Sequence, residues 1–233
     1  MKKCNYIFSL MTFSGLCFSS CIQEGATERP QTWVYSENYV MCYLSEADTL
    51  YLNPEDYHDG RTKYNNGIYL FISGKDCSAH HNKEQFETLS HLYGDTKFHL
   101  SSFKGRRSAS VHVSLAEQLE YISVTSDKDF DENHPAGTRL DDIVFFSAGT
   151  PFPFIKSGYK DWNERTDSYF DGGYTIIEGL LSELNPDDLV LLNTEYMYID
   201  FPKKPKEKEH SITIRVFFKN GKVLSSTKKI III

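Results

Sequence analysis

Apolar residues occupy every second position of the C-terminal segment, up to the dipeptide Asn220-Gly221: Ile212, Ile214, Val216 and Phe218. A period of two is typical of a half-buried strand, and Asn-Gly is a frequent turn between paired strands. The segment therefore predicts a β-hairpin. A two-residue turn would place Phe218 opposite Val223, and a four-residue loop is the alternative.

Further strand-like runs of apolar and aromatic residues recur along the chain, at residues 39–44, 68–72, 110–113, 143–147, 174–177 and 196–201. Many short strands separated by turn residues are typical of a sandwich or barrel. The aromatic fraction of 14% agrees, because Tyr and Phe suit a pleated, half-buried surface. We predict an all-β fold, an antiparallel β-sandwich of the immunoglobulin-like kind with a few short helices.

Helical patterns are few. Residues 82–94 place Phe86, Leu89 and Tyr93 on one helix face before a terminal glycine, and residues 114–117 form a capping-box pattern. Asn185-Pro186 resembles a helix start with proline at the first position. Each predicts a short helix carried on a sheet, and the charged segment 202–209 predicts a solvated loop between two strands.

The N-terminus has the order of a secretory signal: basic, then apolar, then small. Lys2 and Lys3 precede the apolar stretch 6–18, which is followed by Ser19, Ser20 and Cys21. The stretch is shorter than the roughly 20 residues that a membrane-spanning helix needs. A permanent transmembrane span is therefore not expected.

The residues Phe18-Ser19-Ser20-Cys21 resemble the lipobox of bacterial lipoproteins. The resemblance implies that Cys21 receives a diacylglyceryl group, that residues 1–20 are a signal peptide cut off before it, and that the new amine is acylated. Each buried methylene contributes about 0.8 kcal/mol, so several acyl chains together hold a protein stably on a membrane. Cys4 and Cys17 would leave with the signal.

The polar segment 21–32, which contains Gly and Pro, predicts a tether, and residues 33–233 predict a single β-sandwich domain. The expected location is the cell envelope, lipid-anchored. Some lipoproteins of Bacteroidota carry an acidic sorting signal behind the cysteine, and Gln23-Glu24 resembles part of it. This resemblance favours the outer membrane.

The formal net charge is −7, and removal of residues 1–20 with Lys2 and Lys3 leaves −9. Such an acidic body argues against nucleic acid as a partner and gives no electrostatic attraction to anionic lipid. Attachment to the membrane would then come from the lipid on Cys21.

The sequence contains no local catalytic motif: G-x-S-x-G, H-E-x-x-H, a phosphate-binding glycine loop and C-x-x-C are all missing. Asp127, Asp129 and Asp131 alternate as a calcium loop begins, but Glu132 occupies the glycine position and Thr138 that of the bidentate glutamate. This pattern predicts an acidic surface loop, and we expect no cofactor.

Two cysteines follow the anchor. An exported chain matures where disulfides form, so Cys42 and Cys77 either pair or remain two separate buried thiols. Cys77 with His80 and His81 offers metal-ligating atoms, but no fourth ligand stands at a recognisable spacing, so no metal site is predicted.

The two tryptophans are the candidate residues for contact with a ligand. Trp33 and Trp162, with the nearby Tyr159 and Tyr169, could stack on sugar rings, although most aromatic residues of a β-protein fill the core or an interface. The expected partners are the membrane, through the N-terminal lipid, and a glycan or an envelope protein.

The stretches 123–146 and 181–192 resemble small β-rich lipoproteins of unknown function from gut Bacteroidota, a class that implies no catalytic residue. We therefore predict a non-enzymatic binding or accessory module. One alternative is a hydrolase acting on glycan or peptide, with a site assembled from separated loops. Another is a pilus-type structural subunit or anchor, for which residues 230–233 would be the exchanged strand.

Overall fold

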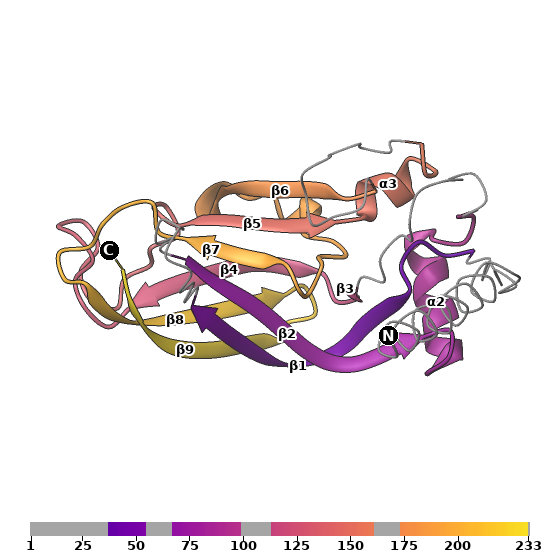
Figure 1. Cartoon of the computed structure of the whole chain (residues 1–233), viewed down its shortest axis with the longest axis horizontal. Helices are drawn as coiled ribbons and strands as arrows, with labels where there is room; N and C mark the ends of the chain where they lie inside the picture. The colour runs from indigo at the N-terminus through magenta and orange to yellow at the C-terminus, as the bar shows by residue number, and fades with distance from the viewer. Residues whose placement is uncertain (1–36, 55–66, 99–112, 161–172, 233) are drawn as a thin grey trace, which may run out of the picture. The chain divides into compact units, whose positions relative to one another are not determined.

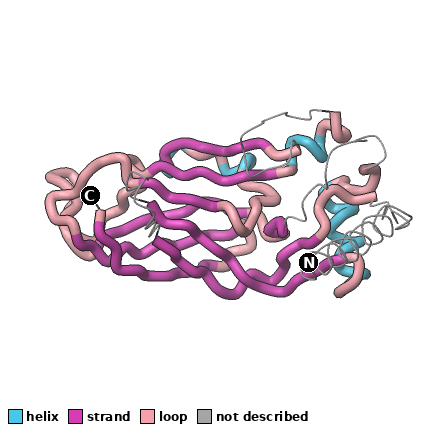
Figure 2. The backbone as a smooth tube through the Cα atoms, viewed as in Figure 1, coloured by secondary structure: helices cyan, strands magenta, loops and turns pink. Residues whose placement is uncertain are grey.

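Two β-sheets dominate the protein, as Figures 1 and 2 show for a computed structural model. The structure describes residues 37–54, 67–98, 113–160 and 173–232, which all belong to the compact unit Ser36–Ile233. The all-β, sandwich-like fold predicted from the sequence is confirmed.

The larger sheet has the strand order β3-β1-β2-β7-β5-β6. Its strands are β1 (Cys42–Pro54), β2 (Gly67–Ser78), β3 (Val113–Leu115), β5 (Phe145–Thr150), β6 (Thr175–Leu180) and β7 (Met197–Asp200). The smaller sheet has the order β4-β8-β9, with β4 (Leu119–Ser126), β8 (Glu209–Phe218) and β9 (Val223–Ile231). Among the described strands, β1 and β3 pair parallel and the other pairs are antiparallel; the parallel pair needs a long connection, which here contains β2 and α2.

The core lies between the two sheets. On β2, Ile68, Leu70 and Ile72 point into it, and on β8 the predicted alternating residues, such as Ile214 and Val216, do the same. These residues are nearly inaccessible to solvent, whereas their neighbours in sequence lie on the opposite faces. The alternation seen in the sequence therefore assigns one face of each strand to the core.

The β8–β9 hairpin has neither the two-residue turn nor a four-residue loop in the same register. β8 ends at Phe218 and β9 begins at Val223, yet Val223 pairs with Phe217, so the predicted pairing with Phe218 is wrong. The Phe218 amide donates to the Lys222 carbonyl at 3.0 Å, and Gly221 has a φ of 85°. The left-handed glycine adds a residue to one side of the turn and shifts the register.

The helical predictions have mixed outcomes. α2 (Lys83–Tyr93) ends at Gly94 as predicted, and Pro186 opens the short 3-10 helix η3 (Pro186–Asp188). The described residues also contain the helices α3 (Phe152–Lys156) and η2 (Leu181–Glu183). Segment 202–209 connects β7 to β8 as predicted, with only Glu209 inside β8. The helix expected at residues 114–117 is wrong, because Ser114 and Leu115 belong to the buried strand β3.

Glu117 belongs to the capping-box pattern but does not cap a helix. Its side chain instead links the two sheets. Its carboxylate accepts from the Ala47 amide at 2.6 Å and lies 3.1 Å from Nζ of Lys222, which also donates to the Ala47 carbonyl. Ala47 belongs to a bulge in β1 in which Glu46 has a φ of 52°. Gly74 faces this bulge, where a Cβ would lie 2.7 Å from the carbonyl oxygen of Ser45.

Candidate functional site

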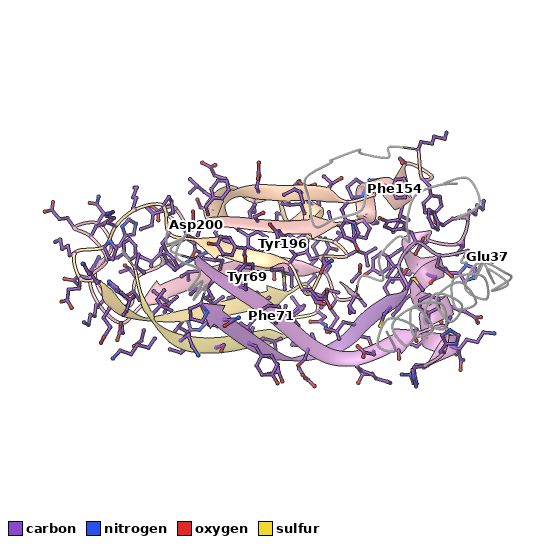
Figure 3. All side chains as sticks on the ribbon, in the orientation of Figure 1. Glu37, Tyr69, Phe71, Phe154, Tyr196 and Asp200 are labelled. Carbon is purple, nitrogen blue, oxygen red and sulfur yellow. The ribbon has the colours of Figure 1, made fainter. Side chains whose placement is uncertain are left out.

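A group of aromatic side chains covers the central part of the larger sheet on the side away from the core. We call this group the aromatic face; its members are Tyr51, Tyr69, Phe71, Phe145, Tyr196 and Tyr198. The residues between them in sequence, such as Leu70 and Met197, point into the core. Figure 3 shows the side chains of Tyr69, Phe71 and Tyr196 over β2 and β7, with Asp200 near them.

Strand pairing fixes how these rings adjoin. Tyr51 pairs with Phe71, and Tyr69 pairs with Tyr198. The ring centroids of Tyr69 and Tyr198 are 4.9 Å apart at an interplanar angle of 53°, and those of Tyr69 and Phe71 are 6.4 Å apart. At the two sides of the face, Tyr51 is 57% exposed and Phe145 is 37% exposed, while the rings between them are half-buried.

Gly67 leaves room for the ring of Tyr198. It pairs with Asp200, one step along the strands from Tyr198, and a Cβ built on Gly67 would overlap the phenol ring of Tyr198. The ring therefore lies against the backbone of β2, in the space that a side chain would fill.

Polar side chains flank two of the rings in one pairing row, whose order across the strands is Asn53, Tyr69, Tyr198, Ser147 and Glu178. Asn53 pairs with Tyr69, and Ser147 pairs with both Tyr198 and Glu178, so amide, hydroxyl and carboxylate groups lie beside the phenol rings. Glu178 is exposed. The face thus offers apolar ring surfaces and hydrogen-bonding atoms at neighbouring positions.

A second aromatic group on the same side of the sheet is covered by helices. Tyr39, Tyr43, Phe86, Phe98 and Phe154 form a buried cluster, which we call the closed cluster, under α2 and α3. The ring of Tyr39 meets those of Phe98 and Phe154 edge-on, with centroids 5.1 and 5.0 Å apart. This geometry is typical of packed interiors.

Asp95 organises the polar side of the closed cluster. Its fully buried carboxylate accepts from the amides of Tyr39 and Val40, both at 2.8 Å, and from the hydroxyls of Tyr159 and Tyr43. Burial raises the pKa of Asp95, and these four donors oppose the rise. Because these contacts fix the chain just after α2 to the segment before β1, to β1 itself and to Tyr159 after α3, we assign Asp95 a structural role.

The acidic loop predicted at Asp127, Asp129 and Asp131 is held by its own carboxylates. Asp131 lies 2.7 Å from Nδ1 of His134, whose Nε2 lies 3.0 Å from Asp142. Burial lowers the pKa of His134, but the two carboxylates outweigh this effect and raise it; the hydrogen bond from His134 lowers the pKa of Asp131. Asp127 and Asp129 accept from the amides of Ser211 and Ala136. The loop therefore uses its acids for its own structure.

One serine–histidine pair bears on the hydrolase alternative. Oγ of Ser126 lies 2.7 Å from Nδ1 of His210, and Nε2 of His210 lies 2.6 Å from the Glu207 carbonyl. Both side chains are buried, at 4% and 1% exposure, and Phe130 packs on the imidazole. A nucleophile needs access to its substrate, so this pair does not support the hydrolase alternative.

Several predicted site residues lie outside the described residues: Cys21 with the signal and tether segments, Trp33 and Trp162. Of the two alternatives for Cys42 and Cys77, the structure has two free, buried thiols. Cys42 pairs with Ser78, and Cys77 pairs with Tyr43, so the two side chains point to opposite faces of the sheet. The pairing raised from the sequence is therefore not formed.

The other candidate metal ligands, His80 and His81, follow the end of β2. His80 and His81 are exposed, whereas Cys77 is buried against Ser45 at 3.2 Å. Within the described part of the chain, no group of three or more His, Cys, Asp or Glu side chains is arranged to hold a metal ion.

The exchanged-strand alternative depends on a loose C-terminus. β9 pairs with β8 as far as Ile231, and Ile230 and Ile232 are buried in the core. The Ile232 amide donates to the Lys208 carbonyl at 2.7 Å. The end of the chain thus completes its own sandwich, which does not favour strand exchange.

Among the described residues, no helix is both long and apolar enough to cross a membrane. Comparison with models of protein families, with curated proteins and with solved structures found no match. The proposed binding role therefore rests on the fold and the aromatic face.

Proposed function

We propose that this protein is a lipid-anchored binding module of the bacterial cell envelope and that it binds carbohydrate through the aromatic face. The observation that supports the binding role is the pair of half-buried rings, Tyr69 and Tyr198, flanked in their row by Asn53, Ser147 and Glu178. The anchoring role is supported by the lipobox-like Phe18-Ser19-Ser20-Cys21.

Carbohydrate fits the chemistry of this surface. A pyranose ring presents C–H groups on its faces and hydroxyls around its edge, and the face of an aromatic ring carries negative charge density that attracts C–H groups. The exposed rings of Tyr51 and Phe145 leave part of their surface open to such a contact. The neighbouring amide, hydroxyl and carboxylate can then bond the sugar hydroxyls.

The binding role is tested with the full chain, purified in detergent and applied to a broad glycan array. We expect at least one glycan to bind, and Tyr69→Ala to reduce its affinity at least tenfold, which corresponds to about 1.4 kcal/mol. Tyr121→Ala is the matched control, because Tyr121 stacks on Phe217 at 4.0 Å on the outer side of the smaller sheet. An array without any bound glycan contradicts the proposal.

The anchor is tested separately. Cells that express the chain are labelled with fatty acid, and Cys21→Ala should remove both the label and the membrane retention. Cys4→Ala is the control, because Cys4 lies within the predicted signal peptide. Labelling of Cys21→Ala at the unaltered level contradicts lipidation at Cys21.

A further inference from the structure

The aromatic face is wider than one sugar ring. Tyr51 lies on β1 and Phe145 on β5, with β2 and β7 between them, so the rings are three strand spacings apart. At about 4.8 Å per spacing this is about 14 Å across the sheet. Phe145 pairs with Asp200, two pairing rows from the row of Tyr51 and Phe71, which adds about 13 Å along the strands.

The exposure of the rings follows this diagonal. Tyr51 and Phe145, at its ends, are the most exposed members, while Tyr69 and Tyr198 between them are half-buried and form a floor. A single sugar could stack on one of these rings only. A ligand that uses both ends must be a chain of several units.

The charge of the protein limits which class of ligand can bind to this face. The outward-facing residues around the rings lie on β1 from Thr49, on β2 up to Ser73, and on β5, β6 and β7. Among those that the structure describes there is no Lys, Arg or His. Glu178 on the same side is acidic and exposed. The whole protein has a formal net charge of −7. A polyanionic glycan would be repelled by this field, whereas an uncharged one would not.

We propose that the aromatic face binds an extended, uncharged oligosaccharide that runs diagonally across the strands from Tyr51 to Phe145. This inference rests on the proposed carbohydrate-binding function and specifies its ligand. A polypeptide helix with a continuous apolar stripe is disfavoured, because it would leave Asn53 and Ser147 without hydrogen-bond partners on the ligand side.

The length of the ligand is tested by calorimetric titration of the full chain in detergent with neutral oligomers, from the monosaccharide upward, in the malto-, cello- and manno-oligosaccharide series. We expect affinity to rise at least tenfold with length and then to level off once the chain spans the face. Tyr51→Ala and Phe145→Ala should lower the affinity of the long chains to that of the short ones.

Tyr51→Ser is a second variant at the most exposed ring, and Tyr121→Ala is again the control. Oligogalacturonates serve as acidic probes and should bind at least tenfold more weakly than the neutral chains. Length-independent binding, or undiminished long-chain affinity in both end variants, overturns the inference but leaves carbohydrate binding intact. Tighter binding of the acidic probes does the same, whereas absence of binding on the whole array overturns the proposed function itself.

Discussion

The same side of the larger sheet carries aromatic residues in two different settings. In the closed cluster, helices α2 and α3 cover the rings, and Asp95 satisfies the hydroxyls of Tyr43 and Tyr159. On the aromatic face, Tyr51 and Phe145 remain exposed, and no described helix or strand packs over them. Tyr196 packs against the closed cluster and joins the two groups.

This difference separates stability from recognition. Rings that meet edge-on under a helix have lost their contact with water and contribute to folding. Rings that stand half-buried on an open sheet contribute less to folding and keep surface for a ligand. Substitutions in the closed cluster should therefore change the free energy of unfolding, and those on the aromatic face should change binding.

The largest effect is expected at the centre of the closed cluster. Phe154→Ala removes a ring that is 1% exposed and should lower the free energy of unfolding by about 3 to 5 kcal/mol, because a cavity remains. Phe71→Ala, on the half-buried aromatic face, should cost clearly less. Urea unfolding of both variants measures the difference, and equal losses would show that the two settings are energetically alike.

A medium effect is expected where the aromatic face meets the backbone. Gly67→Ala places a methyl group inside the ring of Tyr198, which must move, and should cost about 1 to 3 kcal/mol as well as glycan affinity. Gly179→Ala is the control, because its Cβ would lie at an ordinary 3.6 Å from Leu184. Thermal unfolding and titration of the two variants test this; unaltered glycan binding by Gly67→Ala would show that the position of the Tyr198 ring over Gly67 is not required.

Asp95 gives the closed cluster a dependence on pH. Since its pKa is raised in the folded protein, its contribution favours folding below the unfolded pKa of about 3.9 and is lost as the pH rises through the folded pKa. Asp95→Asn should remove this part of the pH dependence above about pH 4. Unfolding by urea at a series of pH values measures it; an unchanged profile in the variant would mean that Asp95 has an ordinary pKa.

The smallest effect is expected at the edge of the aromatic face. Tyr51→Phe removes one exposed hydroxyl and should change the free energy of unfolding by less than about 0.5 kcal/mol. It should keep most of the glycan affinity that Tyr51→Ala loses, because the ring face is retained. Equal losses in the two variants would assign recognition to the hydroxyl and not to the ring.

Local sequence patterns located most of the elements. Runs of apolar and aromatic residues predicted the strands at residues 68–72 and 196–201, and Phe86, Leu89, Tyr93 and the following glycine marked α2. β4 was missed because an irregularity between Leu119 and Tyr121 interrupts its alternation. The capping-box pattern at residues 114–117 was misleading, since pairing with β1 outweighs a local helix signal.

The sequence by itself determined the all-β class and the positions at which apolar and aromatic residues alternate, because the period of a strand is a local property. It drew attention to Trp33 and Trp162 and not to the tyrosines on β2 and β7. Only the tertiary structure decided which side of each strand faces the second sheet, which half lies under α2 and α3, and that Gly67 lies beneath Tyr198. These facts depend on contacts between residues far apart in the chain, and local periodicity contains no information about such contacts.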